Sequence, residues 1–232
     1  YILWYLKTYP TFDLAAWQVG FSRSHACEWT HILLPILEQT MKRKLVLPQR
    51  RISDPEEFLR LYPFAREVFA DGIERSIQRA KNKKKQRKTY SGKKKQHTRK
   101  SVIVSDNHRR ILIVTKAKSG RRHDKRLADK ESVFENLPQD VEVFADTAFT
   151  GEQRVHSKTY IPQKKPRGRE LTASEKEMNR IISSFRVVVE HAIGGIKRYR
   201  CISDKLRNRK AFIDDKFLLL SSGLWNYHLS FT

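Results

Sequence analysis

Two short segments of this chain share one pattern, an apolar run of strand-forming residues that ends in aspartate. The sequence Val-Phe-Ala-Asp occupies residues 68–71 and recurs at residues 143–146. Strands this apolar lie buried in α/β sheets, and open sheets of that kind place their sites at the carboxyl ends of the strands. An aspartate also commonly opens a turn after a strand. Two interpretations therefore stay open: Asp71 and Asp146 form a site together, or each begins a turn.

The remaining pattern predicts an α/β domain. Strands are expected at residues 67–70, 101–104, 111–114 and 141–145, a hairpin turn at 106–109, and helices at 124–137, 174–198 and 217–227. Their order, β-β-β-α-β-α, favours a sheet covered by helices. A hydrophobic content of 39% is enough for a buried core, which excludes wholesale disorder. No apolar stretch reaches the ~18 residues of a membrane span, so we expect no membrane partner.

A third carboxylate lies on the predicted helix 174–198. On a helical wheel, Arg186 and Lys197 fall within about 40° of Glu190, beside a broad apolar arc that predicts a core-facing side. The arc comprises Ile181, Ile182, Phe185, Val188, Val189, Ala192, Ile193, Ile196 and Tyr199. A surface ladder of ion pairs is the alternative. The apolar neighbours of Glu190 favour a less exposed position than such a ladder has.

Three carboxylates that converge on one site favour hard divalent cations as ligands. Two Mg²⁺ ions about 3.5–4 Å apart can activate a water on one side of a phosphodiester and stabilise the leaving oxygen on the other. Zinc is disfavoured because no Cys/His cluster has ligand spacing. The cysteines, Cys27 and Cys201, are expected to be free thiols.

The charge of the chain predicts a polyanionic partner. There are 48 Lys and Arg against 25 Asp and Glu, a formal net charge of +23, and nucleic acid is the default partner at such a charge. Residues 75–100 hold thirteen cations and no acid. Within this segment, the run 81–88 cannot bury itself. Apolar strands flank it, which favours an exposed loop inserted in the fold over a solvated or nuclear-localisation-like tail. The cations expected to contact DNA phosphates there are Lys83, Lys84, Lys85 and Arg87.

The N-terminal portion predicts a helix-turn-helix. Thr11 can cap a helix over residues 12–19, Gly20 can end it, and Ser22 or Ser24 can cap the next helix. Two packed helices without a DNA role fit the pattern equally well. A reader of DNA would place Arg23, Ser24 and His25, at the helix N-terminus, in the major groove.

We expect three parts: a helix-turn-helix domain over residues 1–45, a linker over 46–66 and a catalytic domain over 67–232. Tyr1 in first place predicts that the chain starts inside a longer reading frame.

Residues 179–200 closely resemble the C-terminal signature of insertion-sequence DDE transposases, in the group related to Harbinger elements. That signature has Tyr, two residues, Arg, three residues, Glu, six residues and Lys. Arg186, Glu190 and Lys197 match it, whereas Ser183 stands at the Tyr position. Four more segments resemble family motifs in the same order: Asp71-Gly-Ile-Glu-Arg, the basic residues 90–97, Arg122-His123-Asp124, and residues 146–151 with Ala148 where Gly is common. The resemblance runs from Thr11 to Tyr227.

The resemblance implies an RNase H-like α/β domain behind a small all-α helix-turn-helix domain. It implies Asp71, Asp146 and Glu190 as a triad that binds two Mg²⁺ ions, with Mn²⁺ able to substitute. It also implies that Arg186 and Lys197 bind DNA phosphate. His123 and Asp124 are secondary candidates, because Asp124 opens a predicted helix and an N-cap role would explain it.

The resemblance further implies a reaction and its partners. Water would nick the end of the element, and the freed 3′-hydroxyl would attack target DNA without a covalent protein intermediate. Double-stranded DNA, as terminal inverted repeats and target, is the implied partner of a homodimer in the prokaryotic cytoplasm, associated with the nucleoid.

Two other functions compete with this one. A DNA-binding protein derived from a transposase would bind without cutting, but all three carboxylates are present, which favours the enzyme. A basic RNA-binding or ribosomal protein would explain the charge, but not the paired strand ends or the Arg186/Glu190/Lys197 face.

Overall fold

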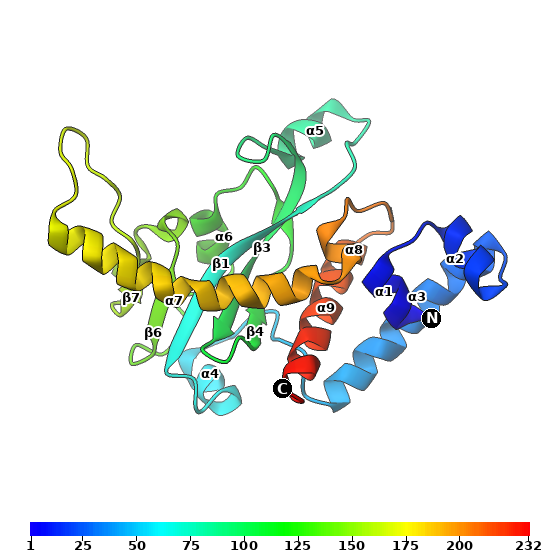
Figure 1. Cartoon of the computed structure of the whole chain (residues 1–232), viewed down its shortest axis with the longest axis horizontal. Helices are drawn as coiled ribbons and strands as arrows, with labels where there is room; N and C mark the ends of the chain where they lie inside the picture. The colour runs from blue at the N-terminus through cyan, green and yellow to red at the C-terminus, as the bar shows by residue number, and fades with distance from the viewer.

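A mixed seven-stranded sheet forms the centre of the computed structural model, which describes all residues 1–232 (Figure 1). The strands are β1 (Glu67–Ser76), β2 (Tyr90–Ser91), β3 (Gln96–Asp106), β4 (Ile111–Val114), β5 (Lys118–Ser119), β6 (Glu142–Ala145) and β7 (Thr159–Tyr160). Their order is β2-β3-β1-β6-β7, and β4 and β5 both pair with β3. The central strand β1 runs antiparallel to β3 and parallel to β6.

Helices cover both faces of this sheet and extend beyond it. They are α1 (Ile2–Thr8), α2 (Phe12–Val19), α3 (Arg23–Arg43), α4 (Pro55–Leu61), α5 (Lys83–Thr89), α6 (Asp124–Lys130), α7 (Ala173–Lys197), α8 (Arg200–Ser203) and α9 (Ile213–Leu229), with short 3-10 turns η1 (Thr147–Phe149) and η2 (Glu152–Arg154). The long helix α7 crosses the sheet and contacts β1, β3 and β6. This mixed α/β architecture is compatible with an RNase H-like fold.

The alternation of side chains along β1 and β6 divides the core in two. Phe69, Ile73 and Phe144 belong to the cluster on the α7 and α9 side, whereas Val68 and Ala70 belong to the cluster on the α4 and α6 side. Successive strand residues point to opposite faces, so Asp71 and Asp146 fall on the α7 face with Phe69 and Phe144.

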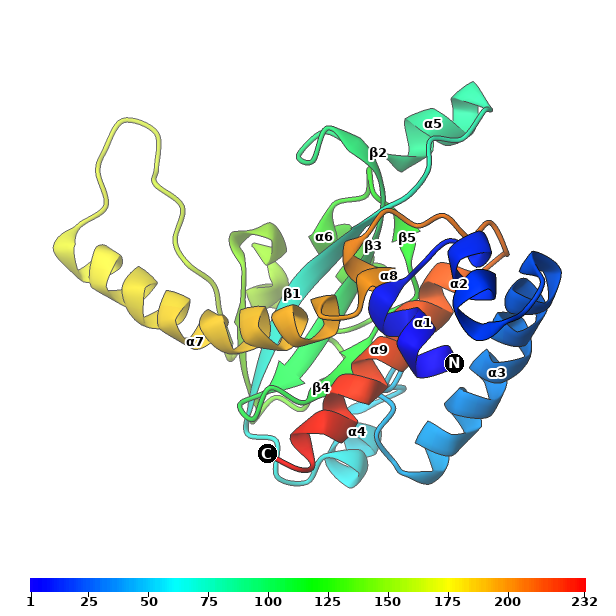
Figure 2. The ribbon, with the colours of Figure 1, turned by 45° about the vertical axis from the view of Figure 1, so that its right-hand side comes forward.

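The N-terminal helices pack against the C-terminal ones and share their core. The rings of Tyr9 and Phe217 meet edge to face at 5.8 Å, and Tyr5 and Leu6 lie in the same apolar cluster as Phe69 of the sheet. Figure 2 shows α1 beside α8, and α3 packs directly on α9 while α2 packs on α3. The division of the chain into a reader and a catalytic domain stays a prediction.

The predicted caps at both ends of α2 and at the start of α3 are confirmed. Thr11 caps α2 by accepting from the Leu14 N–H, and Gly20 ends it in the left-handed region at φ 71°. Of the two serines considered, Ser22 caps α3, accepting from the His25 N–H.

Strand β1 does not end at Asp71 as expected. Its parallel partner β6 does end, with Ala70 opposite Ala145, but its antiparallel partner β3 pairs with it as far as Ser76 opposite Thr98. The backbone ladder on one side therefore keeps the strand extended for five residues beyond Asp71.

Within the basic segment 75–100, the run 81–88 is largely exposed as expected, but most of it forms a helix rather than a loop. The segment contains the end of β1, the helix α5, the strand β2 and the start of β3. Arg75 and Arg99 pair with Asp214 of α9, and Lys100 pairs with Glu74 and Asp124. Distant acids thus hold the cations of the strands, while α5, capped by Asn82, buries no residue.

One other expectation is corrected, and one segment that was not predicted in detail is described. The helix predicted at residues 124–137 ends at Lys130, because Ser132 adopts a left-handed backbone at φ 49°. Residues 46–66 include the helix α4, and Gln49 exchanges backbone hydrogen bonds with Leu112 and Val114. No helix combines the length and apolar character that a membrane crossing needs.

Candidate active site

Asp71 and Asp146 lie side by side on neighbouring strands. Ala70 and Ala145 are register partners in the parallel pair β1/β6. The next residue of each strand is an aspartate, and neighbouring strands lie about 4.8 Å apart. Both aspartates face α7. The pairing of β1 with β6 therefore places the two carboxylates next to each other, as the first of the two interpretations requires.

One oxygen of each aspartate is held by the backbone. Asp71 Oδ1 accepts from the Gly72 N–H at 2.6 Å, and Asp146 Oδ1 accepts from the Thr147 N–H at 2.6 Å. Burial raises the pKa of Asp71, and the negative charges of Asp146 and Asp124 raise it further, against the opposing effects of the Gly72 N–H and Arg186. The site therefore holds negative charge at a cost, and a cation would relieve that cost.

Arg186 supplies such a cation from α7. Its Nη1 lies 3.7 Å from Asp146 Oδ1, and its Nη2 lies 3.7 Å from Glu190 Oε1. The Arg186 side chain is only 17% exposed, and its Nε has no hydrogen-bond partner although it is buried. Arg186 thus joins the strand carboxylate to the helix carboxylate, rather than pointing into solvent.

Glu190 itself is more exposed than expected, with 57% of its side chain accessible. Ile182, Val189 and Ala192 turn toward the core and leave Glu190 at the outer margin of α7. The predicted apolar arc is also incomplete, because Ile181 and Phe185 are exposed. The cause is the length of α7, whose first turns extend past the edge of the sheet (Figure 2).

Asp124 lies on the other face of the sheet. A Cβ on Gly72 would come within 3.1 Å of the Asp124 carboxyl, and Asp124 Oδ1 lies 3.3 Å from Lys100 Nζ. The expected N-cap role of Asp124 is wrong: His123 holds the cap position, without a side-chain hydrogen bond, and Asp124 is the first helical residue. Asp124 instead neutralises Lys100 together with Glu74.

The remaining predicted residues lie on other elements. Lys197 is exposed at the end of α7, and Ser183 is exposed one turn before Arg186. Lys83, Lys84, Lys85 and Arg87 are exposed on α5. Arg23, Ser24 and His25 form the exposed first turn of α3, where Arg23 pairs with Asp13 at 3.4 Å. The structure brings together Asp71, Asp146, Arg186 and Glu190, and none of these other groups joins them.

The donor set fits a divalent metal only in part. Carboxylate oxygens are the ligands that Mg²⁺ prefers, and Oδ2 of both Asp71 and Asp146 makes no hydrogen bond that would compete. No three Asp, Glu, His or Cys side chains are grouped as a metal site, since Glu190 is turned toward Arg186.

Sequence reasoning missed Glu74 and Gly72. Glu74 accepts from Thr98 Oγ1 and pairs with Lys100, and a Cβ at residue 72 would press closely on the Asp124 carboxyl. If the predicted strand 67–70 had been continued beyond Asp71, the alternation of side chains would have placed Gly72 and Glu74 on the same face of the sheet.

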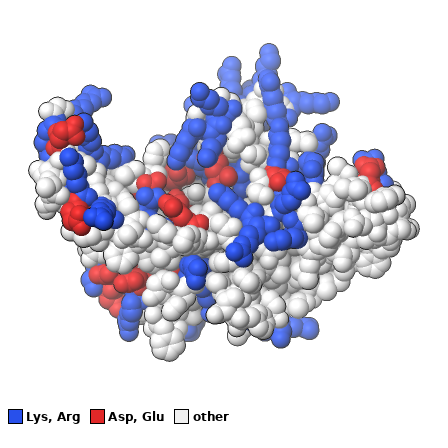
Figure 3. Space-filling view, viewed as in Figure 1, with Lys and Arg blue, Asp and Glu red and all other residues white.

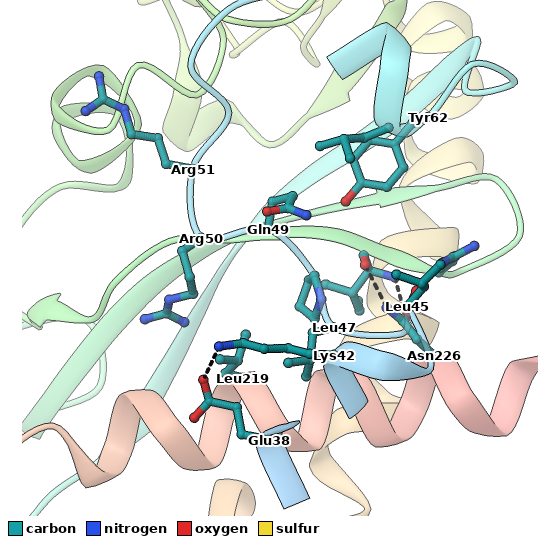
Figure 4. Close-up of a pocket in the computed structure, with 14 residues that line it drawn as sticks. Glu38, Lys42, Leu45, Leu47, Gln49, Arg50, Arg51, Tyr62, Leu219 and Asn226 are labelled. Atoms are coloured by element: carbon teal, nitrogen blue, oxygen red, sulfur yellow. Dashed lines mark hydrogen bonds and ion pairs between the residues drawn. The ribbon is translucent and has the colours of Figure 1, made fainter. Parts of the chain in front are cut away.

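A cavity of about 660 Å³ lies away from these carboxylates, between α3, α9 and the segment after α3 (Figure 4). Side chains in its walls donate hydrogen bonds to the backbone: Asn226 to the carbonyls of Val46 and Ile111, and Arg110 to the carbonyl of Leu45. Figure 4 shows Lys42 directed at Glu38 and Arg51 directed away from the cavity. The cavity is a seam between the N-terminal helices and the sheet.

Comparison with known proteins identifies the family. Residues 70–226 match the family model of the DDE superfamily endonucleases. The chain is 31% identical over 230 residues to a probable transposase for insertion sequence element IS702 from Microchaete diplosiphon, covering 99% of this chain and 79% of that protein. No solved structure matches. The matched region contains all four residues that the fold assembles, and the chain belongs to the DDE superfamily endonucleases, among the insertion-sequence transposases.

Proposed function

We propose that the protein is a DNA transposase that hydrolyses the phosphodiester at the ends of its element and transfers the freed 3′-hydroxyl end to target DNA. The observation that carries the proposal is the register of β1 and β6, which sets Asp71 beside Asp146 under the α7 helix of Arg186 and Glu190. Family membership supports endonuclease chemistry on DNA.

Asp71, Asp146 and Glu190 are the proposed ligands of two Mg²⁺ ions, and Mn²⁺ is expected to substitute. Such ions, if bound there, would supply activation of water or a 3′-hydroxyl and stabilisation of the leaving oxygen. The chain's own residues prepare this site. The backbone N–H groups of Gly72 and Thr147 orient one oxygen of each aspartate, and Arg186 neutralises Asp146 and Glu190 in the metal-free protein. To join the aspartates as a ligand, Glu190 would have to turn away from Arg186, which would free that guanidinium for a DNA phosphate.

DNA is the proposed partner at three places. Lys197 follows the site on α7 and would hold phosphate beside the bond that is cut. The exposed cations of α5 would neutralise flanking or target DNA of any sequence. Arg23, Ser24 and His25, exposed on α3, would read the terminal inverted repeats as part of a helix-turn-helix domain over residues 1–45. A linker (46–66) and an RNase H-like catalytic domain (67–232) complete the proposed organisation.

Two copies would bring the two ends of the element together as a homodimer. The proposed location is the prokaryotic cytoplasm, in association with the nucleoid. The residues proposed to read DNA on α3 and those proposed to bind phosphates on α5 are exposed. DNA binding therefore does not require metal ions in the catalytic site.

The test is an end-cleavage and joining assay with the full chain and DNA that carries the inverted repeats flanking its reading frame. We expect a nick at the repeat end and joined product in Mg²⁺ or Mn²⁺, and neither in EDTA. Tight binding to the repeats without any cleavage in either metal would contradict the proposal and favour a transposase-derived DNA-binding protein. RNA competing equally with duplex DNA would favour an RNA-binding protein.

A further inference from the structure

A second concave site lies beyond the far end of β1, between α5, the β2/β3 hairpin and the loop after β5. Its cavity measures about 640 Å³. The lining side chains that matter here are Arg79, Gln86, Arg87, Tyr90, His97 and Arg121. None of them belongs to the carboxylate site.

The cavity is strongly cationic and contains no acid. Arg79, Arg87 and Arg121 line it, and none of the three forms an ion pair with a carboxylate. Arg79 Nε donates to Gln86 Oε1 at 3.0 Å, which holds this side chain and leaves its terminal amino groups available. Three guanidinium groups around one hollow repel each other, and an anion with several oxygens, such as a phosphate, would relieve the repulsion.

An aromatic side chain lies in the same cavity. Tyr90 is 44% exposed. Its ring packs edge to face against the His97 ring, with the ring centroids 5.6 Å apart. His97 Nδ1 is in turn 3.1 Å from Thr89 Oγ1, so the pair of rings is held in place. An exposed, fixed aromatic ring offers a stacking surface to a nucleobase, but a base inside a duplex is already covered on both faces.

We propose that this cavity binds a nucleotide of an unpaired DNA strand, its phosphate held by Arg79, Arg87 and Arg121 and its base stacked on Tyr90. The proposal rests on the proposed function and adds a ligand of defined chemistry to it. β1 and β3 stay paired from Asp71/Ile103 to Ser76/Thr98, five residues or about 17 Å, before the hairpin begins. At the duplex rise of about 3.4 Å per nucleotide, this separation corresponds to about five nucleotides between the cavity and the bond that is cut.

The experiment measures binding in EDTA, so it does not depend on catalysis. The full chain is titrated into a labelled blunt duplex, and into the same duplex with a five-nucleotide single-stranded tail or with an abasic tail of equal length. We expect the base-containing tail to bind more tightly than the blunt duplex. Tyr90→Ala should remove this preference, with a loss of roughly fivefold or more on the tailed DNA, and Tyr90→Phe should keep it.

Lys88→Ala is the matched control. Lys88 is exposed on α5, next to Arg87, but does not line the cavity. It should weaken blunt and tailed DNA equally. Arg121→Ala should reduce the preference for the tail more than Lys88→Ala does, and circular dichroism checks that each variant is folded. A tail preference unchanged in Tyr90→Ala, or equal binding of abasic and base-containing tails, would overturn the proposal while leaving the proposed function intact. If the wild type binds no DNA, the proposed function fails first.

Discussion

Arg186 contacts carboxylates on both sides of the candidate site, although the sequence motif suggested a phosphate-binding role. The guanidinium lies 3.7 Å from an oxygen of Asp146 and 3.7 Å from an oxygen of Glu190. A buried cluster of carboxylates needs a counter-charge, and in the metal-free protein this arginine provides it. Divalent ions would supply the same charge when they bind.

Replacing Arg186 should therefore make the fold depend on metal. Arg186→Gln is expected to lower the free energy of unfolding by roughly 0.5–1 kcal/mol in EDTA, because both carboxylates lose their partner. Added Mg²⁺ should raise the melting temperature of the variant more than that of the wild type. Arg180→Gln is the control: Arg180 pairs with Glu177 on the exposed side of the same helix, and its loss should change neither value. An equal response to Mg²⁺ in all three proteins would argue against the counter-charge role.

Glu152 is a second buried carboxylate, away from the proposed triad. Burial raises its pKa from about 4.5 to about 7, and neighbouring Asp129 adds to the effect, while Lys125, 3.2 Å away, opposes it. A raised pKa means that the folded state favours the protonated acid. The contribution of Glu152 to stability is thus fully present below pH 4.5 and is lost as the pH rises through about 7.

Glu152→Gln should remove this pH dependence. Relative to the wild type, the variant is expected to gain about 1 kcal/mol or more in free energy of unfolding between pH 4.5 and pH 7.5. Urea unfolding of both proteins at the two pH values measures the difference. A difference between variant and wild type that does not change with pH would show that Glu152 titrates normally.

At the scale of elements, the crossing of α7 and α9 positions the helix that carries Glu190. Gly195 of α7 lies against Trp225 of α9, and a Cβ there would come within 2.4 Å of the indole ring. The indole cannot withdraw freely, because its Nε1 donates to the Arg109 carbonyl at 2.9 Å. The next glycine, Gly194, faces open space.

These neighbouring glycines give a matched pair of variants. Gly195→Ala should destabilise the fold by about 1–3 kcal/mol through overpacking and should slow cleavage by displacing α7. Gly194→Ala should be neutral or stabilise the helix by up to about 1 kcal/mol. Denaturant unfolding and the cleavage assay check both variants. Equal stability of the two would mean that the helices can separate without cost.

Elements with local causes were predictable from the sequence, and those with distant causes were not. The cap at Thr11 and the left-handed Gly20 depend on neighbouring residues, and both are found. The continuation of β1 depends on pairing with β3, and the burial of Arg75 depends on Asp214, 139 residues away. At the site, the pairing of Asp71 and Asp146 followed from two like strands, but the contact of Arg186 with Asp146 required the crossing position of α7.

At the scale of the whole molecule, the positive charge is unevenly distributed. Lys and Arg side chains project mainly from the upper half of the view in Figure 3, which includes the α5 region, whereas the part of α2 and α3 seen on this face is largely uncharged. Arg75, Arg99 and Lys100 are neutralised inside the fold. The α5 cations stay exposed. This arrangement is expected of a surface that contacts DNA phosphates without recognising the base sequence.

Removing four of the α5 cations should change the salt dependence of DNA binding. The variant with Lys83, Lys84, Lys85 and Arg87 replaced by Ala is expected to flatten the log–log salt slope by up to roughly 3–4, at about 0.9 per phosphate contact. Affinity should fall equally for terminal-repeat and random duplex. An unchanged slope would mean that α5 does not contact DNA, and a loss confined to repeats would mean that it reads sequence.

The most direct test of the proposed catalytic site is cleavage by the carboxylate variants Asp71→Asn, Asp146→Asn and Glu190→Gln. An amide keeps the volume of each side chain but is a poor Mg²⁺ ligand, so each variant should lose end cleavage and still bind end DNA. Asp140→Asn, an exposed aspartate paired only with Arg66, should cleave like the wild type. Near wild-type cleavage by any one of the three variants would remove that residue from the site, and near wild-type cleavage by both aspartate variants would contradict the catalytic role of the β1/β6 pair.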